Sequence, residues 1–360
     1  MNPLDAARLH RDAIVVDTHN DLLCSVVLRP VERWGRYFRM RWLPQLRTGG
    51  VDVQVLPVWI DDPHRPEGAL RQTLRMIEAA HRIAAENADE VALCTDAAQL
   101  DAAATAGRIA LVLALEGVPG IGEDVELLAT MHRLGVRMVS LTHFGRSALA
   151  DGSAEDDTGS RLTAAGVAAI GELERLGIVV DVSHLGRSGV QHVLELATRP
   201  VIASHSSARA LRDHHRNLDD DQLRAIAAGG GVVCINFYPG FVAERDAGVG
   251  HVVDHLEHVA EVAGIAHVGI GPDFVREVEH DITPPGVEAL VVGGCGPDAV
   301  LPGLTGPAEL PALTGELVRR GWPADDVVRV LGGNALRLLG SRLGTSDLAA
   351  PGGYAGARLG

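Results

Sequence analysis

The stretch Val15-Val16-Asp17-Thr18-His19-Asn20-Asp21 places an imidazole between carboxylates at the end of a short apolar run. The same arrangement recurs along the chain, with Glu116 after residues 111–115, His143 after 138–142, His184 after 178–183, His205 after 201–204 and Asp273 after 268–272. In parallel-barrel enzymes, the chemistry lies at the strand ends on one rim of the sheet. Several imidazoles and carboxylates at one such rim predict a divalent-metal site.

Strand-like and helical patterns alternate through most of the chain. The apolar runs are residues 13–18, 51–58, 109–115, 136–142, 177–183, 200–205, 231–237 and 267–272, and helical spacing appears at 72–88, 122–134, 163–176, 188–197, 219–228 and 251–263. We expect Ser188 and Asp219-Asp220-Asp221 to begin two of these helices. Eight such units predict an α/β protein with a (β/α)8 TIM barrel. No break in composition divides it, so we expect one domain over residues 1–345 and a mobile Gly/Ala-rich tail over 346–360.

Composition narrows the function classes. The chain has 360 residues, 46% of them hydrophobic and 22% charged, as in an ordinary soluble globular protein. Its formal charge of −15 argues against nucleic-acid or anionic-membrane partners, which need basic patches. The four scattered cysteines suggest neither a disulfide framework nor a cysteine zinc site. Without a signal-peptide profile or an apolar run long enough to span a bilayer, the expected location is the cytoplasm.

The first metal-ligand candidates lie close together in sequence. His19 and Asp21 are two residues apart, so along a strand they point the same way and can share one ion. A solvated surface pair is the alternative. Glu116 either caps the turn before Gly117 or faces the rim, where its two carboxylate oxygens can bridge two cations.

The remaining candidates fall on later strands. His184 and His205 end neighbouring runs, and neutral imidazoles suit zinc, although a lone histidine there is more often structural. His143 either ligates a metal or donates a hydrogen bond to a developing oxyanion. Asp273 takes a proton, binds an ammonium or merely begins a turn. Arg216 either clamps a carboxylate or is solvated at the surface.

Three other motifs in the sequence lack residues or positions that the catalytic or binding sites they resemble require. His251, His255 and His258 share a helix face, but Val252 stands where a zincin needs glutamate, so a surface or packing stripe is expected. The run 204–207 lacks the glycines of a nucleophile elbow, and Gly229-Gly230-Gly231 precedes a strand, unlike a phosphate loop.

From about Ile14 to Leu339 the chain resembles the membrane (renal) dipeptidase family, a branch of the amidohydrolase-like metal barrels. The resemblance rests on the motifs at residues 17–22, 43–51, 115–117, 141–143, 180–184, 204–208, 216–217, 236–238, 269–274 and 332–334, which occur in the family's order. The segment 29–42, rich in arginine and aromatic residues, the loop after His143 and the loop 283–308 depart from it, and we assign the segment 29–42 and the loop 283–308 no role.

This resemblance implies two Zn²⁺ ions per chain. His19 and Asp21 would bind one ion, His184 and His205 the other, and Glu116 would bridge them. It further implies that His143 contacts the scissile carbonyl, Arg216 the substrate carboxylate, Asp273 the amino end or the transferred proton, and that Tyr238 helps to bind substrate. A homodimer is also implied.

The predicted function is hydrolysis of dipeptides by a hydroxide activated between two zinc ions. A different reaction at the same site, on another amide, a lactam, a lactone or a biosynthetic conjugate, is the alternative. A non-catalytic metal-binding barrel would be favoured by loss of a ligand, and none is lost. A third hypothesis makes the arginine-rich segment a docking site for an acidic partner, or an entrance that attracts anionic substrates.

Overall fold

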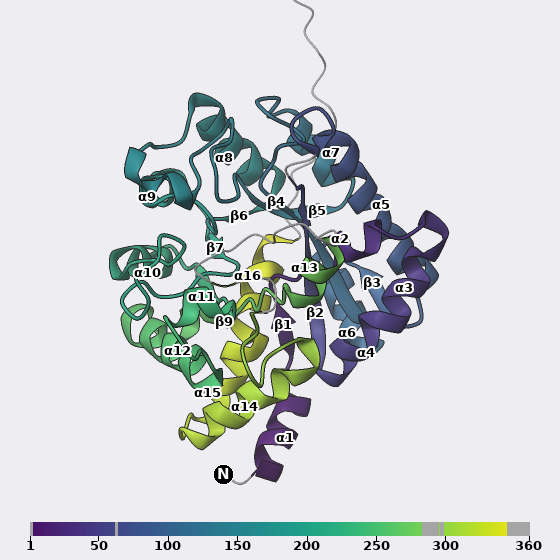
Figure 1. The fold of residues 1–360 in the computed structure, drawn as a ribbon, viewed down its shortest axis with the longest axis vertical. Helices are drawn as coiled ribbons and strands as arrows, with labels where there is room; N and C mark the ends of the chain where they lie inside the picture. The colour runs from purple at the N-terminus through teal and green to yellow at the C-terminus, as the bar shows by residue number, and fades with distance from the viewer. Residues whose placement is uncertain (1–2, 62–63, 283–294, 296–298, 344–360) are drawn as a thin grey trace, which may run out of the picture.

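The computed structural model describes residues 3–61, 64–282, 295 and 299–343, and its parallel strands confirm the predicted barrel. The strands follow the order β1-β2-β4-β5-β6-β7-β8-β9, with helices around them (Figure 1). Their bounds are β1 Val15–Asp17, β2 Val51–Trp59, β4 Ile109–Glu116, β5 Val136–Ser140, β6 Val179–Asp181, β7 Ile202–Ala203, β8 Val232–Ile235 and β9 Val268–Ile270. At the seam, Thr18 N donates to the Ile270 carbonyl at 3.4 Å, joining β1 to β9, and the Thr18 hydroxyl donates to the Ser204 carbonyl at 2.5 Å.

One strand was not predicted. β3 (Val91–Leu93) pairs in parallel with the first residues of β4, and β5 pairs with its last residues. Two of the three β3 residues are only half-buried, and three residues are too few to show a period. β3 is therefore an addition to the eight predicted strands.

The predicted helices are present with adjusted ends. The α-helices are α1 Pro3–Asp12, α2 Leu22–Val27, α3 Trp34–Arg41, α4 Leu43–Thr48, α5 Ala69–Glu86, α6 Ala97–Thr105, α7 Leu127–Arg133, α8 Ala164–Leu176, α9 Arg187–Leu196, α10 Asp220–Ala228, α11 Pro239–Val242, α12 Val249–Ala263, α13 Arg276–Ile282, α14 Leu310–Arg319, α15 Ala324–Val328 and α16 Asn334–Arg342. Asp219 caps α10 in a capping box with Gln222, as expected. The prediction for Ser188 is wrong, because α9 begins earlier, with Gly186 at its N-cap.

The core has two parts. The larger lies between strands and surrounding helices, and the smaller fills the barrel interior with side chains such as Val55, Val112 and Met138. Leu338 and Leu339 of α16 belong to the interior cluster. This helix therefore closes the barrel at the amino-terminal ends of its strands. At the opposite rim, Gly271 allows a close approach, because a Cβ there would lie 1.8 Å from the Ser204 carbonyl oxygen.

The arginine-rich segment 29–42 folds largely into α3. Three of its four aromatic residues, Trp34, Phe38 and Trp42, are buried core residues rather than a docking surface, and Tyr37 is partly buried against the same core. Among its arginines, Arg29 pairs with Asp281, Arg39 with Asp89 and Arg41 with Glu277, at 2.6 to 2.8 Å. Much of the segment's positive charge is thus matched within the chain, which weakens the docking hypothesis.

Other predictions have mixed outcomes. His255 is fully buried on α12, where its Nδ1 accepts from Ala208 N and its Nε2 donates to the Val242 carbonyl, so it is a packing residue.

The tail 346–360 and most of the loop 283–308 lie outside the described residues, and the single domain stays a prediction. In the described part of the chain, every helix is too short or too polar to cross a bilayer.

Candidate metal centre

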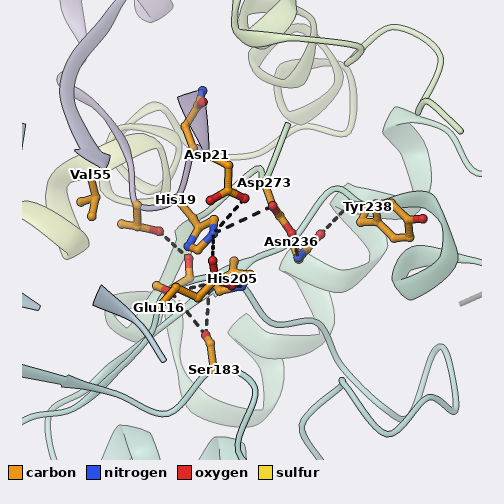
Figure 2. Close-up of polar contacts among 12 residues, drawn as sticks. His19, Asp21, Val55, Glu116, Ser183, His205, Asn236, Tyr238 and Asp273 are labelled. Atoms are coloured by element: carbon orange, nitrogen blue, oxygen red, sulfur yellow. Dashed lines mark hydrogen bonds and ion pairs between the residues drawn. The ribbon is translucent and has the colours of Figure 1, made fainter. Parts of the chain in front are cut away.

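The predicted metal ligands gather at the carboxyl ends of the strands, and Figure 2 shows His19, Asp21, Glu116, His205 and Asp273 close together. His19 and Asp21 follow β1, Glu116 is the last residue of β4, and His143, His184, His205 and Asp273 follow β5, β6, β7 and β9. Because the strands are parallel, these ends share one rim of the barrel. The segments that carry them are separated by up to some 250 positions in the chain.

Glu116 lies at the centre of the cluster and is only 5% exposed. Its Oε2 is 3.4 Å from His19 Nε2. Its Oε1 faces the other histidines, at 2.8 Å from His184 Nε2, 3.5 Å from His205 Nε2 and 3.8 Å from His143 Nε2. The two carboxylate oxygens therefore serve two different groups of ligand-type atoms.

Three overlapping triads in the described residues have the spacing to hold a metal ion. They are His19, Glu116 and His205; Glu116, His143 and His184; and His19, Asp21 and Asp273. His19 Nε2 and Asp21 Oδ1 are buried and have no hydrogen-bond partner among the described residues. A buried polar atom without a partner is costly, so both atoms point to a ligand such as a cation.

The hydrogen bonds of His205 fix which of its nitrogens faces the cluster. Ser204 Oγ donates to Asp181 Oδ2 at 2.5 Å, which uses its single hydrogen. Ser204 Oγ must then accept from His205 Nδ1, at 2.7 Å. His205 Nε2 therefore presents a lone pair, and it lies 2.8 Å from His184 Nε2. Two imidazole nitrogens at that separation suit a shared cation, and a buried carboxylate behind a ligand is a common orienting device.

Burial sets the electrostatics of the cluster. It raises the pKa of Glu116 to about 7 and also raises the pKa of Asp273. It lowers the pKa of His143, His184 and His205, which keeps these imidazoles neutral. Burial also opposes charge on His19, but Glu116 and Asp21 outweigh it and raise the pKa of His19. The carboxylates thus need positive charge beside them, which a divalent cation supplies more fully than a proton.

Two site residues adopt left-handed backbone conformations. His184 has φ of 71° and Asp273 φ of 57°, a region that L-residues seldom occupy. Such strain concentrates at functional sites, where the surrounding fold holds it in place. Asp273 is also held by side chains, since Asn236 Nδ2 donates to its Oδ2 at 2.9 Å.

Three residues that position the site side chains Asp273 and His205 were not predicted from the sequence. Asn236, Asp181 and Ser204 all lie in the motifs quoted for the resemblance, but their role is visible only once the strands are side by side. A polar residue inside a predicted buried strand, such as Asp181 after Val179 and Val180, was the available signal.

The predicted substrate-contacting residues differ in how they lie. His143 is at the edge of the cluster, its ring centroid 4.3 Å from that of His184. Arg216 is buried and donates to Ser206 Oγ and the His205 carbonyl at 2.9 and 2.7 Å. Its Nε has no acceptor among the described residues. Tyr238 lies beyond Asn236, away from the histidines (Figure 2), and its hydroxyl donates to the Cys295 carbonyl.

The chain is similar to known dipeptidases. Residues 4–346 match the family described as Membrane dipeptidase (Peptidase family M19). Dipeptidase aclJ of Aspergillus oryzae is 33% identical over 309 residues, covering 82% of this chain and 68% of that protein. The uncharacterized dipeptidase C965.12 of Schizosaccharomyces pombe is 33% identical over 291 residues, covering 73% and 69%.

Solved structures share the fold. The crystal structure of the M19 metallopeptidase called dipeptidase AC superposes with a TM-score of 0.81 at 26% identity, covering 92% of this chain and 99% of that one. A metallopeptidase from Rhodobacter sphaeroides, liganded with a phosphinate mimic of the dipeptide L-Ala-D-Ala, gives 0.80 at 25% identity with the same coverage.

The tautomer of His205 yields a prediction. Ser204→Ala removes the acceptor for its Nδ1 hydrogen, so we expect divalent-metal affinity to fall by about 10- to 100-fold. Competitive chelator titration of the purified protein measures this. Ser207→Ala, which removes an equally buried hydroxyl bonded to the Asn236 carbonyl, is the matched control. Equal affinities for the two variants would contradict the orienting role of Ser204.

Proposed function

Because this chain belongs to the membrane dipeptidase family, peptidase family M19, we propose that it hydrolyses the peptide bond of dipeptides with two zinc ions. The observation that carries the proposal is the convergence of His19, Asp21, His184 and His205 on the two oxygens of Glu116. Every ligand expected from the resemblance is within this cluster, which disfavours a barrel that only stores metal.

The residues present fit a binuclear site. We assign one ion to His19 and Asp21 on the Oε2 side of Glu116, and the other to His184 and His205 on the Oε1 side. The unpartnered His19 Nε2 and Asp21 Oδ1 support the first assignment. The lone pair of His205 Nε2, fixed through Ser204, supports the second. When bound, such ions lower the pKa of a water to near neutrality and polarise a carbonyl.

The side chains around the cluster position the substrate and handle its charge. Neutral His143 has one ring hydrogen with which to stabilise an oxyanion on the scissile carbonyl. Asp273 Oδ2 is held by Asn236, while its Oδ1 faces the cluster, 4.0 Å from His19 Nε2. That oxygen can bind the substrate ammonium or carry a proton to the leaving amine.

Arg216 is suited to the substrate's terminal carboxylate. Its guanidinium is fixed by Ser206 and His205, its Nε is unpartnered, and each terminal nitrogen keeps a hydrogen to donate. A dipeptide mimic in the Rhodobacter sphaeroides relative supports a ligand with charges at both ends. Tyr238 is a weaker substrate-binding candidate, because its hydroxyl already bonds to Cys295. The homodimer and the cytoplasmic location stay proposals.

The bridging role of Glu116 gives the first functional prediction. Glu116→Gln replaces a carboxylate oxygen with an amide nitrogen that cannot ligate, so we expect dipeptide hydrolysis to fall by about 10³-fold or more and bound zinc to drop. Metal analysis and initial rates measure both. Glu123→Gln, an exposed glutamate on the connection after the same strand, should leave both unchanged. Normal activity and zinc content in Glu116→Gln would refute the bridge.

The charge of the substrate's carboxyl end gives the second functional prediction. A panel of L,L- and L,D-dipeptides, their C-terminal amides and N-acyl amino acids separates dipeptidase activity from other amide hydrolysis. We expect kcat/KM to favour the free carboxylate over the amide by about 10- to 100-fold, the worth of a charged hydrogen bond. Arg216→Met should abolish that preference. A wild-type protein that prefers N-acyl amino acids or lactams would favour the alternative reaction.

A further inference from the structure

The floor of the barrel holds a second polar site, at the end of the strands opposite the metal centre. There α16 plugs the interior, and its last residue, Arg342, reaches the start of β6. Arg342 and Arg137, the second residue of β5, both line a cavity of about 100 Å³ together with Thr95, Asp96 and His132. The cavity has room for a few waters or for one small oxyanion.

Arg342 is incompletely satisfied. The residue is 3% exposed, and its Nη2 donates to the Ile178 carbonyl at 2.9 Å. Its Nε and Nη1 are buried and find no acceptor among the described residues. A guanidinium cannot shed its charge, so these two donors call for an acceptor in the cavity.

Among the residues that the structure describes, Arg137 donates to neutral carbonyl groups. Its Nε donates to the Thr95 carbonyl at 2.6 Å, and its Nη1 donates to the carbonyls of His132 and Val136, both at 2.8 Å. The carboxylate at the cavity, Asp96, already caps α6 by accepting from Gln99 N. The cavity lining thus holds one buried arginine, one half-buried arginine and one carboxylate. Glu174, outside the lining, also acts on Arg342, but its carboxylate already accepts from Thr198 and from Arg199 N.

The pKa shifts of the residues that line the cavity agree with this arrangement of charges. Burial lowers the pKa of Arg137 and lowers that of Arg342 to about 10. Burial, followed by the charge of Arg137, lowers the pKa of His132 to about 4, so this imidazole is neutral at pH 7. The positive charge of the cavity is therefore carried by the two arginines, and Asp96 is the one carboxylate among the described residues that line it.

We propose that this cavity binds a small tetrahedral oxyanion of the phosphate or sulfate type. Arg342 Nη1, which has no acceptor among the described residues, can donate a charged hydrogen bond to such an anion. Arg137 supplies the second positive charge. The bound anion connects the end of α16 to β5 and so stabilises the barrel plug, independently of the catalytic rim.

Thermal unfolding of the zinc-loaded full chain in phosphate, compared with chloride at equal ionic strength, tests the site. We expect phosphate to raise Tm in the wild type and in Arg337→Met, a control on the same helix whose exposed guanidinium donates to the Ala266 carbonyl. In Arg342→Met the apparent Kd for phosphate should rise by about 10- to 100-fold. Arg216→Met should keep the response, since Arg216 lies at the opposite rim. The loss of response in Arg342→Met, whose metal ligands are intact, excludes phosphate bound to the zinc ions as its source.

A crystal of the wild-type protein soaked in selenate gives a readout that requires no variant. We expect an anomalous selenium peak in the cavity, placed so that a selenate oxygen lies within hydrogen-bonding distance of Arg342 Nη1. If Arg342→Met does not fold, this peak decides the question. A cavity without the peak, or equal phosphate responses in Arg342→Met and Arg337→Met, would overturn the proposal whether or not the dipeptidase activity is confirmed.

Discussion

The rest of the structure depends on the need for positive charge around Glu116. This buried carboxylate lies among four imidazoles and within reach of Asp21 and Asp273, where water cannot stabilise ionised groups. In metal-free protein, the proton on His19 supplies part of that charge. A pair of divalent cations supplies it more fully, because ligand-type atoms lie beside both oxygens of Glu116.

The barrel fold holds the buried carboxylates and imidazoles of this site close together. The five expected metal ligands lie at or just beyond the ends of β1, β4, β6 and β7, which contribute apolar side chains to the interior cluster. This packing fixes their backbone before any metal binds. The left-handed His184 and Asp273 show the strain that this frame bears. Hydrogen bonds from Asn236 to Asp273 and from His205 to Ser204 then set individual atoms. Chemistry is confined to one rim, while α16 closes the other.

Much of this was predictable from sequence because strand ends carry two signals at once. An apolar run gives the strand, and the polar residue that ends it gives the ligand, as with Glu116 after residues 111–115. A strand as short as β3 is too short to show the alternation of apolar and polar residues that indicates a strand. The aromatic residues Trp34 and Phe38 of α3 resembled a surface motif, although they pack in the core. The tautomer of His205 and the arginine pair on the barrel floor depend on contacts between distant segments, which no local pattern encodes.

The central claim is that Glu116 separates two metal ions held by this chain's own side chains. Anomalous diffraction at the zinc absorption edge, from crystals of the zinc-loaded protein, tests it most directly. The account predicts two peaks, one beside His19 and Asp21 and one beside His184 and His205, with a Glu116 oxygen coordinating each. A single peak, or zinc located away from Glu116, would contradict it.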